Sequence, residues 1–176
     1  MSDSYISLIP TVSEYPNQKI IATDICTWLI TEAIIKPEAS ACILSTKPGY
    51  SVSEQAQKAV YAPSLLPFHL ATNGLEIVTE RTVFSTELEE LICPNCKYNI
   101  ASDDWDLTPW LEQRSIGMIC PQCAQEASIE QYTFRPDWGF SNLGFTFWNW
   151  PILTQQFIKA FEAQLGCPVS VVYGKV

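Results

Sequence analysis

The residues with the clearest chemical role are four cysteines in two C-x-x-C pairs, Cys93 with Cys96 and Cys120 with Cys123. Two residues between cysteines allow one tight turn to direct both thiols at a single point. Two such turns, joined by residues 97–119, can complete a tetrahedron of sulfur ligands. Zinc accepts this geometry readily, and thiolates are its preferred structural ligands. We therefore expect one structural metal ion, Zn²⁺.

Both pairs share the pattern C-P-x-C, as Cys93-Pro94-Asn95-Cys96 and Cys120-Pro121-Gln122-Cys123. This pattern resembles the knuckles of the zinc-ribbon family and of rubredoxin-like sites, over about 35 residues (91–125). The resemblance implies a zinc-ribbon module but no particular activity. Such knuckles often carry glycine after the second cysteine, where the backbone turns left-handed. Lys97 and Ala124 stand there instead, at a cost of ~1 kcal/mol each if the left-handed geometry is kept.

Other interpretations of the cysteines remain open at this stage. Iron in place of zinc would make an electron-transfer site, while two disulfides, free thiols or a redox centre would need no metal. A catalytic zinc keeps one position open for water, whereas four cysteines close the shell. The N-terminal residues show no signal-peptide pattern and no apolar run is long enough to span a membrane. We therefore expect a cytoplasmic protein, in which seven cysteines favour metal over disulfides.

The charge of the chain limits its partners. A net charge of −9 repels nucleic acid and anionic membranes, because phosphate binding depends on lysine and arginine. The predicted module is also acidic, with a net charge of −2 over residues 91–125 (two basic and four acidic residues). An acidic protein of this kind suits a basic protein partner, and we expect neither nucleic acid nor membrane as a ligand.

Candidate catalytic groups are few. His69 is the only histidine, and it could act as a base for the thiol of Cys26, Cys42 or Cys167. Buried cysteines commonly behave as small apolar residues, and no nucleophile turn surrounds these three. The acidic cluster at residues 103–106 is typical of a turn in which Asp106 or Ser102 caps a short helix through Leu111. The sequence therefore offers no catalytic constellation.

The pattern of apolar residues predicts the elements that must position the metal site. A helix is expected after Pro16, ending at Pro37, and a second helix from Pro151 to a cap at Gly166. Strands are expected at 75–84, 143–149 and 169–173, the second of them buried on both faces. Residues 1–15 are interpreted as an extended arm. The predicted fold is α+β: a single domain (1–176) with a mixed β-sheet packed by N- and C-terminal helices and an inserted zinc-ribbon excursion at 91–125.

Aromatic residues are concentrated between Tyr132 and Trp150. Those of the predicted strand suit a core, whereas Trp138 and Phe140 fall in a predicted loop. Exposed loop aromatics make good anchors in protein interfaces. We therefore expect Trp138 and Phe140 to be candidate partner-binding residues.

These observations favour a non-catalytic, protein-binding role over an enzyme. The acidic composition is comparable to that of small bacterial proteins that neutralise a toxin by binding it, and an adaptor fits equally. One alternative is an enzyme with a purely structural zinc and a pocket near residues 63–69. Another is a zinc-ribbon protein associated with nucleic acid.

Overall fold

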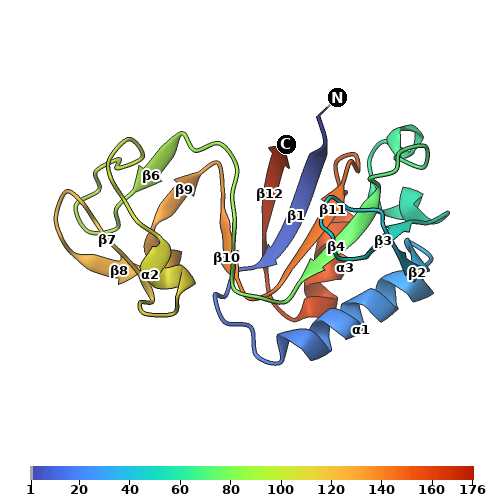
Figure 1. Cartoon of the computed structure of the whole chain (residues 1–176), viewed down its shortest axis with the longest axis horizontal. Helices are drawn as coiled ribbons and strands as arrows, with labels where there is room; N and C mark the ends of the chain where they lie inside the picture. Colours follow the sequence, from blue (N-terminus) through green and yellow to red (C-terminus); the bar gives the residue numbers. More distant parts are fainter. Residues whose placement is uncertain (1) are drawn as a thin grey trace.

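A six-stranded sheet forms the larger part of the protein. The structure is a computed structural model, and it describes residues 2–176. From edge to edge its strands are β12 (Val169–Lys175), β1 (Ser4–Pro10), β11 (Gly144–Trp148), β4 (Gly74–Val78), β3 (Gly49–Val52) and β2 (Ile35–Ser40) (Figure 1). Every neighbouring pair in this sheet runs antiparallel, whereas the sequence predicted a mixed sheet. The reason is that β1 lies between β11 and β12, which would otherwise be parallel neighbours joined by a helix.

The N-terminal segment is therefore part of the sheet, and its interpretation as an extended arm is wrong. Leu8 and Ile9 of β1 are both fully buried, on opposite faces of the strand. Their pairing partners lie more than 130 residues away in the sequence, at Phe145 and Ser170. A local pattern carries no information on partners so distant.

Two helices cover one face of the sheet, α1 (Gln18–Thr31) and α3 (Gln155–Leu165) (Figure 1). Their apolar stripes pack together, with the rings of Trp28 and Phe157 stacked 6.1 Å apart. The α+β class and the packing of the sheet by N- and C-terminal helices are thus confirmed. The first helix ends at Thr31, six residues before Pro37, which lies instead in edge strand β2.

Helix α3 ends at the predicted signal, but it begins at Gln155, four residues after the predicted start at Pro151. The hydroxyl of Thr154 accepts a hydrogen bond from the backbone N–H of Phe157 at 3.0 Å. Gly166 closes the helix in the left-handed region at φ 82°, which confirms its prediction as the cap. No helix in the described residues is long and apolar enough to cross a membrane.

The second face of the sheet meets a two-stranded ribbon, β5 (Thr82–Phe84) with β10 (Gly139–Ser141). The predicted single strand at 75–84 is thus two strands, β4 and β5, in two different sheets. The contact is close, because a Cβ atom on Gly139 would lie 2.8 Å from the side chain of Ile9. A Cβ atom on Gly144 would lie 2.2 Å from the ring of Phe84.

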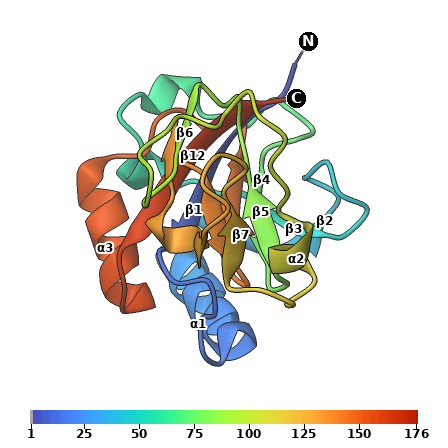
Figure 2. The same cartoon turned by 90° about the vertical axis from the view of Figure 1, so that its left-hand side faces the viewer.

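The chain between β5 and β10 forms a separate module beside the sheet, which faces the viewer in Figure 2. Its elements are β6 (Glu90–Ile92), α2 (Thr108–Leu111), β7 (Gly117–Ile119), β8 (Glu126–Ser128) and β9 (Thr133–Arg135). Strand β6 pairs with β9 and β7 with β8, so the predicted excursion at 91–125 lies inside this module. The module has its own apolar core, which includes Leu91, Ile100, Trp110 and Met118.

Candidate metal centre

The two cysteine pairs occupy equivalent turns. The first follows β6, and the second connects β7 to β8. In each turn the carbonyl of the first cysteine accepts a hydrogen bond from the N–H four residues later: Lys97 to Cys93 at 3.1 Å and Ala124 to Cys120 at 2.9 Å. Lys97 and Ala124 have φ values of 62° and 58°, so both take the left-handed conformation. The knuckle geometry expected from the C-P-x-C pattern is therefore present without glycine.

Backbone N–H groups in the turns also point at the sulfur atoms. The N–H of Asn95 donates to the Sγ of Cys93 and that of Gln122 to the Sγ of Cys120, both at 3.4 Å. Such donors stabilise a thiolate. The same contact in both turns shows that the two knuckles are repeats of one structure.

The four sulfur atoms converge. The Sγ atoms of Cys93 and Cys123 lie 3.8 Å apart, as do those of Cys96 and Cys120, and all four ligand atoms lie within 4.8 Å of one another. A regular tetrahedron with metal–sulfur bonds of ~2.3 Å has edges of about 3.8 Å. A disulfide would need sulfur atoms at ~2.05 Å, so the cysteines are free thiols placed at metal-ligand spacing.

Burial differs among the four ligands. Cys93 and Cys120 are fully buried in the module core, Cys123 is half-buried and Cys96 is exposed. The site therefore sits between the core and the outer surface of the module, and a bound ion would tie the two knuckles to the same packed interior.

Without a cation, the cluster ionises unevenly. Burial opposes ionisation of Cys93, yet hydrogen bonds from the backbone of Cys96 and Asn95 and from neighbouring thiols lower its pKa to about 7. At Cys96 a backbone hydrogen bond from Tyr98 favours the thiolate, but desolvation and contacts with the other three cysteines raise the pKa to about 11. Thiol protons shared within the cluster thus oppose full ionisation, and a bound divalent cation would replace them.

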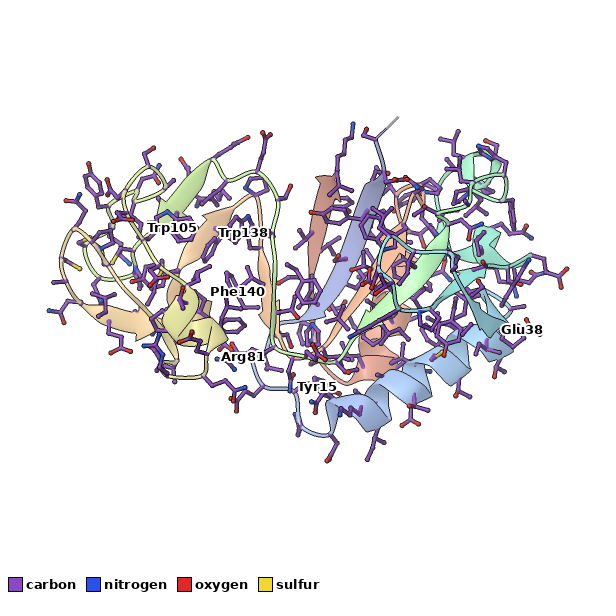
Figure 3. The ribbon with its side chains drawn as sticks, in the orientation of Figure 1. Tyr15, Glu38, Arg81, Trp105, Trp138 and Phe140 are labelled. Carbon is purple, nitrogen blue, oxygen red and sulfur yellow. The ribbon has the colours of Figure 1, made fainter. Side chains whose placement is uncertain are left out.

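Aromatic side chains pack behind the site. The ring of Phe134 stacks on Trp138 at 5.2 Å and lies 4.8 Å from Phe140, while Trp110 meets Phe140 edge-on at 5.5 Å. Phe140 belongs to β10 and is buried, so its expected exposure on a loop is wrong. Trp138 is half-buried, and binding of a partner through it stays a prediction. Figure 3 shows Trp138 and Phe140 on the side of the module that faces the sheet.

Arg81 joins the module to the sheet, a role that no local sequence pattern indicates. Its guanidinium lies 4.0 Å from the ring centre of Trp110, and its Nε donates to the Trp110 carbonyl at 2.7 Å. It also pairs with Glu14 at 3.3 Å. An arginine 29 residues before a tryptophan gives no local signal of this contact, which depends on the fold.

The other candidate groups do not assemble into a catalytic site. His69 is exposed, Cys26 and Cys42 are buried in different clusters, and no hydrogen bond within residues 2–176 joins the imidazole to a thiol. Asp106 accepts a hydrogen bond from the N–H of Thr108, the first residue of α2, at 2.9 Å, but the capping position predicted for Asp106 or Ser102 is occupied by Leu107. Hydrogen bonds from the side chain and then the backbone of Thr108 lower the pKa of the Asp106 carboxyl group.

No known protein family, curated protein sequence or solved structure matches the chain.

Proposed function

We propose that Cys93, Cys96, Cys120 and Cys123 bind one zinc ion that holds a zinc-ribbon module in place. The observation that carries this proposal is the convergence of four thiols at the edge length of a zinc–thiolate tetrahedron. Four protein ligands leave no position for water, which distinguishes a structural zinc from a catalytic one.

The module's small size supports the proposal. Its strands β6, β7, β8 and β9 have three residues each and pair only two by two. Two-stranded sheets this short are marginal on their own. Zinc binding contributes roughly 10–16 kcal/mol in zinc-finger peptides, which is ample to fix such a structure.

We further propose that the protein acts by binding a basic protein, as an adaptor or a neutralising partner, and not by catalysis. The net charge of −9 favours association with a positively charged surface. A closed metal shell offers no Lewis acid to a substrate, and His69 is exposed and forms no hydrogen bond to a thiol within residues 2–176. Nucleic acid is disfavoured, because the chain has ten basic residues against nineteen acidic ones.

Metal analysis with a matched pair of variants tests the zinc proposal. We expect one zinc per chain in the purified protein and in Cys167→Ser, which removes a cysteine outside the cluster. Cys96→Ser, at the exposed ligand, should lose the metal without opening a cavity. Chelation should abolish protection of the module amides from hydrogen exchange, while amides of the six-stranded sheet stay protected. Iron in the protein, or a metal content unaffected by Cys96→Ser, would contradict the proposal.

A further inference from the structure

The two edges of the six-stranded sheet differ in how they are protected against pairing with another chain. Edge strand β2 carries Lys36, Pro37 and Glu38, and its register shifts between Ile35 and Ala39. Charges, proline and a bulge are the usual devices that prevent a free edge from pairing. That edge is therefore closed to an additional strand.

The opposite edge, β12, has none of these devices except one terminal lysine. Its seven residues, VSVVYGK, pair with β1 in unbroken register and include no proline. Figure 1 shows β12 at the end of the sheet nearest the module. A strand of this length and composition is a template for strand addition.

The register fixes which backbone groups of β12 point outward. Asp3 and Val176 exchange both of their N–H···O hydrogen bonds, at 3.0 and 2.9 Å. Because hydrogen-bonded pairs alternate along an antiparallel ladder, Gly174 and Val172 also face β1, whereas Tyr173 and Val171 direct their N–H and carbonyl groups away from β1. No hydrogen bond of the described chain involves these outward groups of Val171 and Tyr173.

Two hollows adjoin this strand, one near each end. Ser170 lines a hollow of about 300 Å³ together with Glu130, Asp137 and Trp138 of the module side. No lysine or arginine lines this hollow. The edge strand therefore begins beside two carboxylates and a half-buried indole.

The second hollow, of about 760 Å³, is lined by Tyr173 and Lys175 of β12 together with Glu87 and Ile152. Across both hollows the lining holds three carboxylates and one lysine. A strand laid along β12 would thus pass from an acidic hollow to one that holds Glu87 and Lys175, and its side chains on alternate positions would reach them.

We propose that β12 is the docking strand of this protein and that its occupant is an extended segment of a basic partner protein. This inference rests on the proposed protein-binding function and specifies where and how binding occurs. The main-chain groups of Val171 and Tyr173 supply the hydrogen bonds, and the carboxylates of Glu87, Glu130 and Asp137 select lysine and arginine. A second copy of this chain is the poorer occupant, because it carries the same net charge of −9.

The test uses the whole zinc-loaded chain and two short synthetic peptides, one of alternating lysine and valine and one of alternating glutamate and valine. We expect the basic peptide to slow amide exchange at Val171 and Tyr173, and the acidic peptide not to bind. Tyr173→Pro should weaken binding about tenfold or more, because it removes an outward N–H and obstructs the added strand. This N–H makes no bond to β1, and prolines are tolerated on edge strands at such positions.

Tyr173→Val is the matched control, since it keeps the backbone donor and changes only a side chain that is 49% exposed. Its loss of binding should be clearly smaller than that of Tyr173→Pro, because the outward N–H remains and only the side chain that lines the second hollow changes. The inference would be overturned if Tyr173→Pro bound the basic peptide as tightly as the natural protein does, or if the basic and acidic peptides bound equally well. It would also be overturned if the natural protein formed a dimer that Tyr173→Pro dissociates. Binding that protects amides elsewhere would overturn the assignment to β12 but leave the protein-binding function in place. If neither peptide binds, the inference is also overturned. Cross-linking of the whole chain in cells then tests separately whether the protein binds a protein partner at all.

Discussion

Ala124 offers a direct test of the knuckle geometry, because it holds a left-handed conformation that glycine adopts without strain. Its φ is 58° and its side chain is exposed, so Ala124→Gly removes backbone strain and no packing. The left-handed conformation costs an L-residue roughly 1–2 kcal/mol, whereas the greater freedom of glycine in the unfolded chain returns about 0.5–1 kcal/mol. We expect the variant to be more stable by about 0.5–1 kcal/mol.

Two assays measure this gain. Thermal unfolding of the zinc-loaded protein should shift upward by about 1–4 °C, the range for a chain of this size. If the left-handed turn is needed to bind the metal, competition with a chelator should show zinc affinity raised by about two- to fivefold. Lys97→Gly, at φ 62° in the other knuckle, should act in the same direction.

Ala160→Gly is the matched control, since it makes the same replacement at an exposed position inside helix α3. There glycine should destabilise the protein by about 0.8–1 kcal/mol and leave zinc affinity unchanged. If Ala124→Gly were destabilising to the same extent as Ala160→Gly, residue 124 would not be left-handed, and the repeated-knuckle description of the site would be refuted.

Two further substitutions test contacts that connect elements. Arg81→Ala should destabilise the protein by about 2–4 kcal/mol in urea unfolding, because it removes a charged hydrogen bond to the Trp110 carbonyl and a cation–π contact. Arg81→Lys keeps the charge but should still lose part of this energy. If Arg81→Ala were as stable as the natural protein, the contact would not be formed. Thr154→Ala should cost about 1 kcal/mol in thermal unfolding through loss of the cap on Phe157 N–H, whereas Thr154→Ser should be nearly neutral; equal losses in the two variants would show that the hydroxyl does not cap α3.

The features that could be predicted from the sequence are those with a local signal. Cysteine spacing indicated four ligands for one ion, and their sulfur atoms do converge. Glycine marked the end of helix α3, whose cap at Gly166 is confirmed, whereas its start at Gln155 lies four residues after Pro151. The run at 143–149 contains the buried strand β11, because a strand covered on both faces is mostly apolar, and its one hydroxyl, on Thr146, is hydrogen-bonded to Ser7.

The features that could not be predicted depend on contacts between distant residues. Strand β1 resembles an arm in sequence, since nothing near it specifies pairing with both β11 and β12. Residues 75–84 alternate like one strand, but the chain leaves the main sheet after Val78 and pairs again with β10 from Thr82. The contact between Arg81 and Trp110 likewise depends on the packing of the module against the sheet.

The aromatic residues of the module illustrate why composition misleads about binding surfaces. A module built from three-residue strands buries little apolar area in its sheets alone, so large side chains must supply much of its core. Phe134 and Phe140 fill that core and are buried, and Trp138 is half-buried against them. Aromatic rings committed to packing have little surface left for a partner. The backbone groups of β12 that point away from β1 leave no trace in the composition, yet they can still accept and donate hydrogen bonds. An interface is therefore better sought on β12 than among the aromatic residues of the module.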